Sequence, residues 1–419
     1  MPPDAHRPFS PRRRIGVLAA LTTAAALAVA ACGGSSSGGS SSSSSSSSAA
    51  ADKSPIIVGA AVARSGLASP FDQPPLNSFK LAMKQINARG GIAGRRIELI
   101  EGDTQSDIGR TPAVATDLIA RKANVLLVTC DYDFGAPAAN VAQQKGVVSF
   151  SLCATSPKFG VQGVGDKAYS PAASIGNEAA ALATYAIQQG WKKADLMLDP
   201  SLAYTRGLCK AFESFYKQLG GSIVGRQPLR QDGVSTGPQI NRLRSSGAQV
   251  ALMCSYPPGG ASVVRAVRAA GVDLPLMSGN SFGGAFWVKA APGISDFYVV
   301  TNTSTFGDDP NPAVNRLVQQ YVETYGDQPS TTQAVMGYSI AQMLQEAIGK
   351  AKSTDGAAVA AQLNKLSNFP TMSGSVTYTA TDHIPLNREL EIVRFTKGKP
   401  QFVQKVTPKI KVTLADGAA

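Results

Sequence analysis

Short apolar runs alternate with amphipathic stretches along much of the chain, starting at residue 55. The run at residues 56–62 has no charged side chain, which is typical of a strand buried on both faces. Residues 76–88 follow, with Leu76, Phe79 and Met83 at helical spacing on one face. Repetition of these two patterns predicts β-α-β units, which build parallel sheets covered by helices on both faces.

The alternation occurs in two series. The first predicts strands at residues 56–62, 96–101, 125–129 and 147–151, and helices at residues 76–88, 112–120 and 137–145. The second predicts helices at residues 177–189, 204–219, 240–245 and 261–270, and strands at residues 194–198, 222–224, 250–254, 274–277 and 297–301. Two lobes are expected, because about 360 residues exceed what one core usually serves. A ligand is then expected between the lobes, at the carboxyl ends of the strands.

The last part of the chain has a different pattern. Two long helices are predicted at residues 313–325 and 332–350. We then expect antiparallel strands at residues 376–378 and 390–395 around a turn at residues 382–387, and a final strand at residues 401–406.

The N-terminus carries an export signal. Arg12, Arg13 and Arg14 precede an apolar run at residues 15–31, and Val29-Ala30-Ala31-Cys32 fits the lipobox, in which the cysteine is acylated after cleavage. Residues 33–51 are almost all serine, glycine and alanine, a tether with no side chains to pack. An ordinary secretory peptide with a chance cysteine is the alternative. We expect a surface lipoprotein anchored through Cys32.

Composition excludes some classes of site. Removing the four arginines and one aspartate of the signal segment from a formal charge of +12 leaves +9, and the basic residues are scattered, whereas nucleic-acid-binding proteins cluster them. His383 is the one histidine outside the signal segment, so a zinc site with two or three histidines is excluded. We expect no metal and no cofactor.

Four cysteines remain after Cys32, an even number for an oxidising compartment. They are Cys130, Cys153, Cys209 and Cys254. Two disulfides are expected, and three pairings are open at this point.

A Gly-x-Ser-x-Gly pattern at residues 279–283 raises the alternative of a serine hydrolase. It follows a predicted strand, and Asp308, Asp309 and His383 come later in the order of a catalytic triad. A glycine loop at the mouth of a ligand site explains the same pattern, and we expect no catalytic residue.

The sequence resembles the leucine/isoleucine/valine-binding proteins, the substrate-binding lipoproteins of ABC importers. The most specific motif is Ile86-Asn87-Ala88-Arg89-Gly90-Gly91-Ile92-Ala93-Gly94-Arg95-Arg96-Ile97, similar to the family's I-N-x-x-G-G-I-x-G-x-x-I. Further matches are Ser65-Gly66, the Cys153-Ala154-Thr155-Ser156-Pro157 run and Tyr204-Thr205-Arg206-Gly207. The resemblance covers about residues 55 to 405.

The resemblance implies an α/β fold of two Rossmann-like, doubly wound lobes joined by three crossovers, the type I periplasmic binding protein fold. It places residues 1–31 in the signal peptide and residues 32–54 in the lipidated tether. Lobe 1 is then residues 55–170 and 305–369, and lobe 2 is residues 171–304 and 370–410. Crossovers are expected near residues 170–173, 301–305 and 369–374.

The resemblance also implies a set of ligand-binding residues. They are Phe71, Asp131, Tyr132, Ala154, Thr155, Tyr204, Tyr256 and Asn280. In the family, Ala154 and Thr155 correspond to an Ala-Thr pair that grips a carboxylate. Asn280 stands where the leucine-type proteins carry a glutamate that pairs with the ligand's ammonium group. Trp287 is a further candidate for the cleft mouth, with burial in the core as the alternative.

Two acids follow Cys130, in a loop that is usually rich in serine and threonine in the family. Either the anionic partner has moved to Asp131 or Asp133, or the ligand is not an ordinary amino acid. A helix N-cap is the alternative for Asp133, and a solvated loop acid for Asp131. In this fold Cys130 and Cys153 end neighbouring strands, so we favour Cys130–Cys153 and Cys209–Cys254 as pairs.

We therefore expect a monomeric, extracytoplasmic lipoprotein on the cell membrane that binds no nucleic acid. It captures a small organic solute by hinge closure and delivers it to ABC permease subunits. A lipoprotein that presents its ligand to a receptor kinase is the second reading, since the fold serves both roles.

Overall fold

The apolar runs of the first series form a parallel sheet. In the computed structural model, which describes residues 53–231 and 236–417, this sheet has the order β2-β1-β3-β4-β5. Its strands are β1 (Ile56–Val62), β2 (Ile97–Asp103), β3 (Val125–Val128), β4 (Val148–Ser151) and β5 (Ala168–Tyr169). The strand order reverses between β1 and β3, and an open α/β sheet binds ligands beside such a reversal.

The second sheet is parallel except at one edge. Its order is β14-β13-β10-β9-β8-β6-β7, and β13 and β14 are antiparallel. Its strands are β6 (Lys193–Leu198), β7 (Ser222–Pro228), β8 (Val250–Cys254), β9 (Leu276–Ser278), β10 (Phe297–Thr301), β13 (Leu390–Thr396) and β14 (Lys399–Val406). The predicted architecture of two doubly wound sheets is confirmed.

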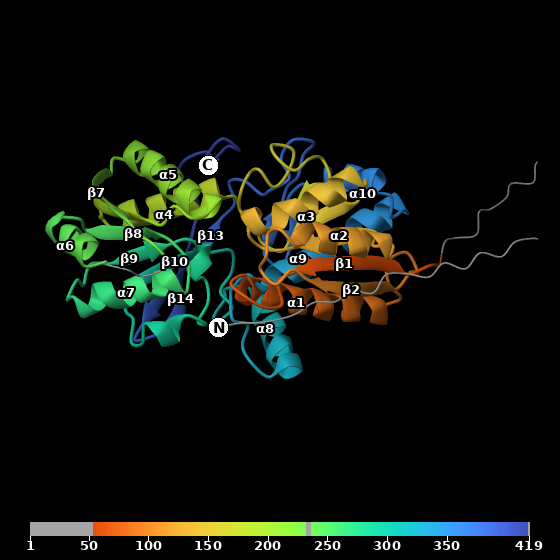
Figure 1. Cartoon of the computed structure of the whole chain (residues 1–419), viewed down its shortest axis with the longest axis horizontal. Coiled ribbons are helices and arrows are strands. Elements are labelled where there is room, and N and C mark those ends of the chain that lie inside the picture. The colour runs from red at the N-terminus through yellow and green to blue at the C-terminus, as the bar shows by residue number, and fades with distance from the viewer. Residues whose placement is uncertain (1–52, 232–235, 418–419) are drawn as a thin grey trace, which may run out of the picture. The chain divides into compact units, whose positions relative to one another are not determined.

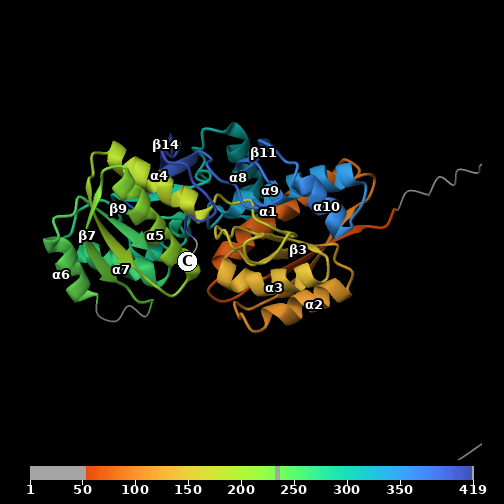
Figure 2. The ribbon, with the colours of Figure 1, turned by 90° about the horizontal axis from the view of Figure 1, so that it is seen from above.

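Helices cover both faces of each sheet (Figures 1 and 2). They are α1 (Ser69–Ala88), α2 (Thr111–Ala120), α3 (Tyr132–Gln144), α4 (Ile175–Gln188), α5 (Ala203–Gln218), α6 (Gly237–Ser245), α7 (Gly259–Ala269), α8 (Pro312–Tyr325), α9 (Ala334–Ala351) and α10 (Gly356–Leu363). Two short 3-10 turns, η1 (Asn280–Phe282) and η2 (Val288–Ala290), follow β9.

Each sheet separates two layers of core. Val58 and Ala60 of β1 pack with α1, α9 and α10, whereas Ala61 packs with α2 and α3. In the second sheet, Val300 of β10 faces the layer of α4 and α5, and Val299 faces that of α7. Adjacent strand residues point to opposite faces, so both layers are filled from one strand. Residues Asp52–Ala419 form one compact unit with its own core.

Helix α1 begins at Ser69, seven residues before the predicted start at Leu76. Pro74 and Pro75 are unfavourable inside a helix, because proline lacks the N–H that a helix interior needs. The structure places both prolines inside the helix. The carbonyl of Pro70, which would have accepted from the missing amide of Pro74, accepts instead from Ser330 Oγ at 3.2 Å.

The glycine-rich motif after α1 has a structural role. Asn87 bonds both backbone groups of Ile97, as donor to its carbonyl at 2.9 Å and as acceptor from its amide at 2.8 Å. Gly91 has φ +79°, and a Cβ there would collide with the backbone of Arg95. The motif therefore turns the chain directly from α1 into β2, as the sequence predicts.

The segment after α10 differs from the prediction. Residues 369–374, expected as a crossover, lie in a hairpin of β11 (Phe369–Thr371) and β12 (Gly374–Val376). The strand expected at 376–378 thus pairs with β11 and not with β13, and Val376 and Tyr378 pack into the core of the first sheet. The chain rejoins the second sheet at Leu390, where β13 pairs with β10.

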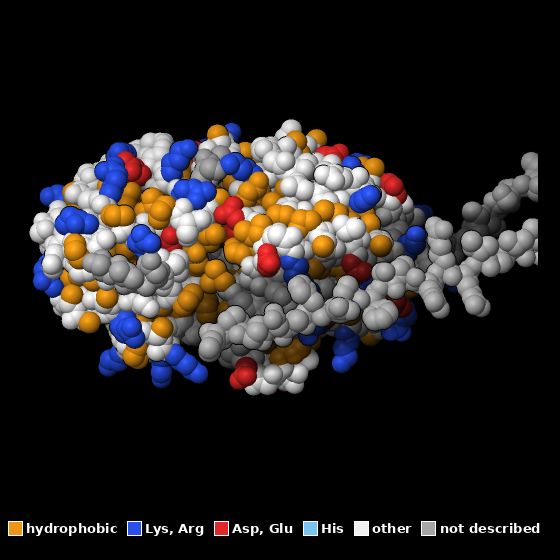
Figure 3. All heavy atoms as spheres, viewed as in Figure 1, with side chains coloured by type: hydrophobic (Ala, Val, Ile, Leu, Met, Phe, Trp, Pro, Cys, Tyr) orange, Lys and Arg blue, Asp and Glu red, His pale blue; other side chains and the backbone are white. Residues whose placement is uncertain are grey.

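The predicted signal segment, Cys32 and most of the tether lie outside the described residues. Within residues 53–231 and 236–417, no helix has the length and apolar character needed to cross a membrane. On the face drawn in Figure 3, Lys and Arg side chains are spread among neutral ones rather than gathered in one patch.

Candidate functional site

A pocket opens at the carboxyl ends of strands from both sheets. The space between its lining atoms is about 710 Å³ with the open mouth included. Seventeen residues line it: Leu67, Ala68, Phe71, Cys130, Asp131, Tyr132, Phe134, Cys153, Ala154, Thr155, Ser156, Leu202, Tyr204, Tyr256, Asn280, Ser281 and Gln333. All eight predicted ligand residues are among them. Their contact with a ligand stays a prediction.

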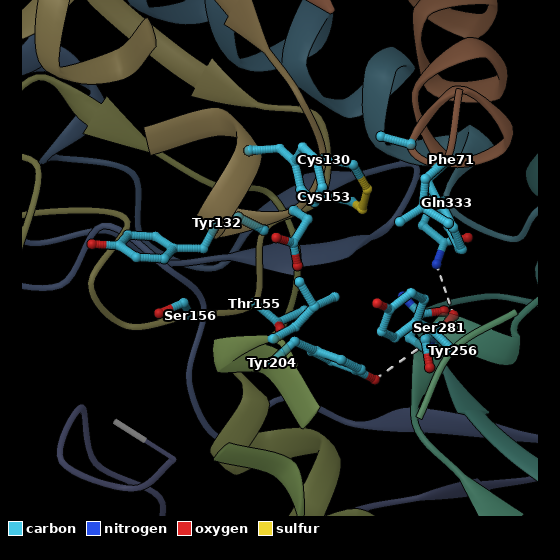
Figure 4. A pocket seen from close by; sticks show the side chains of 17 residues that line it. Phe71, Cys130, Tyr132, Cys153, Thr155, Ser156, Tyr204, Tyr256, Ser281 and Gln333 are labelled. Carbon is cyan, nitrogen blue, oxygen red and sulfur yellow. Dashed lines mark hydrogen bonds between the residues drawn. A yellow bond between two sulfur atoms is a disulfide. The ribbon is translucent and has the colours of Figure 1, made fainter. Parts of the chain in front are cut away.

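Two loops of the first sheet form one wall of the pocket, which we call the first wall (residues 130–134 and 153–156). Val128 of β3 and Ser151 of β4 are register partners, so the residues two positions further on, Cys130 and Cys153, are neighbours. Their Cα atoms are 4.4 Å apart, and the two sulfur atoms face each other in Figure 4. Cys209 and Cys254, with Cα atoms 5.7 Å apart, form the other close pair. Both are the pairs favoured from the sequence.

Two serines just outside the first wall, Ser151 and Ser170, satisfy part of its backbone. Ser151 Oγ accepts from the amides of Cys153, at 3.2 Å, and Ala154, at 2.7 Å. Ser170 Oγ donates to the carbonyl of Ala154 at 2.5 Å. Both backbone groups of Ala154 are therefore occupied, so its amide is not available in this structure for the carboxylate grip that the family pattern implies.

Asp131 is the N-cap of α3. Its Oδ1 accepts from the amide of Asp133 at 2.8 Å, and its backbone is extended, as at most N-caps. The capping role suggested for Asp133 thus belongs to Asp131, because α3 begins at Tyr132 and not near Pro137. Asp131 is half-buried, which corrects the alternative of a solvated loop acid. Burial, and then the charge of Asp133, raise its pKa to about 7.

Asp133 reaches across to the second sheet. Its Oδ2 accepts from the amide of Ala203, at the first residue of α5, at 2.9 Å. The residue before it, Leu202, offers α5 no side-chain cap. Asp133 therefore supplies an anion to the N-terminus of a helix in the other half of the molecule, where negative charge is stabilised.

We call the facing side, formed by Tyr204, Tyr256, Asn280 and Ser281, the second wall. Tyr204 donates through its hydroxyl to Glu178 Oε2 at 2.9 Å, and the amide of Asn280 donates to the same oxygen at 3.1 Å. Burial raises the pKa of Glu178 to about 7 and that of Tyr204 well above its usual value. A Cβ on Gly279 would collide with both Tyr204 and Glu178. This cluster therefore leaves no room beside it.

Sequence reasoning missed Glu178. It lies in α4, is 1% exposed, and does not line the pocket itself. The available signal was a single acid in the otherwise uncharged run 171–190. A charge in a fully buried helix needs polar partners, and here they lie at the ligand pocket.

The remaining pocket residues are aromatic or amide-bearing. Tyr256 is buried and its hydroxyl lies 3.1 Å from Ser201 Oγ. Asn280 accepts at its side-chain oxygen from Thr332 and at its carbonyl from Gln333 Nε2, at 2.7 Å. In Figure 4 the ring of Tyr132 points away from Thr155, Tyr204 and Tyr256. Tyr132 thus lines the pocket without facing its centre.

The aromatic contact at the first strand–helix loop is Phe286 and not Trp287. Phe71 packs edge-on against Phe286 with ring centroids 5.4 Å apart. Trp287 is 3% exposed and packs in the core edge-on against Phe282 and Phe297 and at a tilt against Phe395. The alternative of core burial for Trp287 is therefore the correct one.

The serine of the Gly-x-Ser-x-Gly pattern has no triad around it. Ser281 donates to the carbonyl of Ser255 at 2.8 Å. His383 lies at the first sheet, where its Nδ1 is 3.0 Å from the carbonyl of Ala168 and its ring stacks on Tyr169. Among the described residues, no group of three or more His, Cys, Asp or Glu is placed to hold a metal ion.

The comparison with known families decides the identity. A sequence profile of the family described as periplasmic binding protein matches residues 55–400. The chain belongs to this family. It is therefore an extracytoplasmic solute-binding protein, and the resemblance noted in the sequence is confirmed.

Relatives and solved structures agree with this assignment. Leu/Ile/Val-binding protein homolog 3 of Brucella melitensis is 22% identical over 346 residues, which cover 82% of this chain and 92% of that protein. The leucine-specific-binding protein of Salmonella typhimurium is 23% identical over 303 residues, 71% of this chain and 80% of that protein. The substrate-binding protein LivJ of Streptococcus pneumoniae, solved with isoleucine, has TM-score 0.75 and 21% identity, covering 84% of this chain and all of that one.

A second structural neighbour has a different ligand. The solute-binding protein of an ABC transporter from R. palustris, solved with benzoate, has TM-score 0.72 and 18% identity, covering 85% of this binding protein and 98% of that chain. At such identities the likeness shows the fold alone.

Proposed function

We propose that this binding protein captures a small organic solute in the pocket at the two sets of strand ends and delivers it to the permease subunits of an ABC importer. One observation carries the proposal. The eight residues chosen from the sequence come from the loops and first helical turns that follow strands of both sheets, yet they line one pocket. Family members work with ABC permeases, and a site built from two halves allows the halves to close on the solute.

We propose that the two halves are lobes that hinge at their connections. Residues 55–170 with 305–369 form one lobe, and residues 171–304 with the later part of 370–410 form the other. The separate cores of the two sheets support this division. Because Val376 and Tyr378 belong to the first core, we place the third crossover between Tyr378 and Leu390.

We also propose that the mature protein is a monomer without catalytic activity, anchored to the membrane by a lipid on Cys32. Both disulfides form in the oxidising extracytoplasmic space, because each pair lies within bonding distance. Metabolic labelling with an alkyne fatty acid tests the anchor. The wild-type chain is expected to be labelled and Cys32→Ser to be unlabelled and released from membranes; equal labelling would contradict the anchor.

A thermal-shift screen of residues 52–419 tests the binding function. The ligands in the solved structures suggest the first probes, branched-chain amino acids and benzoates, to which we add amides and amines. A solute that binds only the native state must raise Tm. Tyr256→Ala, in the pocket, is expected to lose the shift, and Lys217→Ala, on the exposed face of α5, to keep it. A shift that survives Tyr256→Ala unchanged would place the solute elsewhere.

A further inference from the structure

The pocket contains a single charged side chain, Asp131. The other lining residues are apolar, aromatic, hydroxyl-bearing or amides, and none of the seventeen is Lys, Arg or His. The Oδ1 of Asp131 caps α3 through the amide of Asp133. No ion pair to Asp131 is present among the described residues. Its charge is thus exposed to the pocket without a protein cation beside it.

Asp72 and Asp133 are the acids closest to Asp131, and a further acid, Glu178, lies behind the second wall. Asp72, in the first turn of α1, is fully buried and accepts from the amides of Ala63 at 2.7 Å and Cys130 at 2.8 Å. Asp133 accepts from the amide of Ala203, and Glu178 from Tyr204 and the amide of Asn280. Amides and hydroxyl groups are the hydrogen-bond partners of these three acids, and none of the three forms an ion pair among the residues that the structure describes.

Aromatic faces complete the lining. Phe71, Phe134, Tyr204 and Tyr256 surround the space together with the sulfur atoms of Cys130 and Cys153. The faces of aromatic rings are electron-rich and attract ammonium groups, more strongly when water is excluded. A carboxylate among aromatic rings thus attracts a cation in two ways, by its charge and through the rings.

The same surroundings disfavour an anionic ligand group. The amide of Ala154, a candidate donor for a ligand carboxylate, already donates to Ser151. A carboxylate beside Asp131 would be repelled in a site of low dielectric. A buried acid without a counter-charge is also costly, and a ligand cation removes that cost.

We infer that the pocket selects an organic amine: an ammonium group at Asp131 on an apolar body, without a carboxylate. This inference rests on the proposed function and names the class of solute. It departs from the zwitterionic amino acids that the family pattern implies. The raised pKa of Asp131 supports it, because burial and Asp133 destabilise the carboxylate that an ammonium group would stabilise.

Matched probes test the inference by calorimetry on residues 52–419 at pH 8. One set is leucine, 3-methylbutylamine and 4-methylpentanoate, and the other is phenylalanine, 2-phenylethylamine and 3-phenylpropanoate. Within each set the apolar body is kept while the ammonium or the carboxylate is removed. We expect the amine of at least one set to bind at least tenfold more tightly than its two partners.

Asp131→Asn separates charge from structure, since asparagine keeps the N-cap. Amine affinity is expected to fall at least tenfold in Asp131→Asn and to stay unchanged in Asp117→Asn, on the exposed face of α2. In the wild type, amine affinity is expected to fall as pH drops from 8 to 6, because the protonated Asp131 must release its proton. The groups nearest to it that titrate are Asp133, Asp72 and Tyr256.

Two results would overturn the inference. If an amino acid or a carboxylate binds more tightly than the amines and Tyr256→Ala abolishes that binding, the selection for amines is wrong and the proposed solute-binding function stands. If none of the six probes binds, the inferred selection for amines is also wrong. The broader thermal-shift screen alone then decides the proposed function.

Discussion

The two walls of the pocket are built on different principles. In the first wall, both backbone groups of Ala154 are bonded by the adjacent serines Ser151 and Ser170, and one carboxylate, Asp131, lines the pocket. In the second wall, Tyr204 and Asn280 are already bonded to the same oxygen of Glu178, and Tyr256 and Ser281 are paired with Ser201 and the carbonyl of Ser255. The first wall thus supplies the charge that a solute meets, and the second supplies a rigid aromatic shape. Specificity and rigidity are separated between the two halves.

Removing the two cysteine pairs should give the largest effects. Chain-entropy estimates for separations of 23 and 45 residues are about 3 kcal/mol for Cys130–Cys153 and about 4 kcal/mol for Cys209–Cys254. Denaturant unfolding of the two double serine variants measures both losses. Only the first pair lines the pocket, so only its loss is expected to weaken solute binding as well. Equal binding by both variants would remove the distinction between the walls.

Glu178→Gln tests the second wall through pH. The native pKa of Glu178, about 7, exceeds its ordinary 4.5, so the native state keeps a proton that the unfolded state releases in this window. The stabilisation by protonated Glu178 is therefore fully present below pH 4.5 and is lost as the pH rises through 7. The loss in unfolding free energy is about 3 kcal/mol at most. Glu178→Gln should flatten the dependence by that amount between pH 5 and pH 8. Parallel curves for the two proteins would refute this.

Asp133 connects the halves and should give the smallest effect. Asp133→Ala removes the acceptor for the amide of Ala203, with an expected cost of about 1 kcal/mol. Hydrogen exchange of the first turn of α5 is expected to speed up about fivefold. Asp133→Asn keeps an acceptor without the charge, so its exchange rate should lie between those of the wild type and Asp133→Ala. Unchanged exchange in Asp133→Ala would mean that the contact contributes no protection to α5.

The pocket residues were predictable because they follow strands directly. Strand ends are marked by apolar runs such as residues 125–129, and the residues after them, such as Asp131 and Thr155, must lie at the carboxyl edge of the sheet. Glu178 was not predictable in this way. It lies inside a helix, and its role depends on the packing of α4 against Tyr204 and Gly279, which no local pattern encodes.

Helix starts account for the other differences. Helix α3 starts at Tyr132 and not near Pro137, so its N-cap is Asp131 and not Asp133. In α1, the hydrogen bond that Pro74 cannot donate to Pro70 is replaced by one from Ser330, which lies 256 positions after Pro74. This tertiary contact allows the helix to continue through the prolines. Long-range partners of this kind are invisible in a local window.

The crowding around Gly279 bears on how new specificities can arise. A side chain there would displace Tyr204 and Glu178 together, so the second wall offers few viable substitutions. Asp131, Phe71 and Thr155 on the opposite side can change while that cluster stays intact. A mutant library aimed at a new solute should therefore randomise these three positions, and its successful members should retain glycine at residue 279.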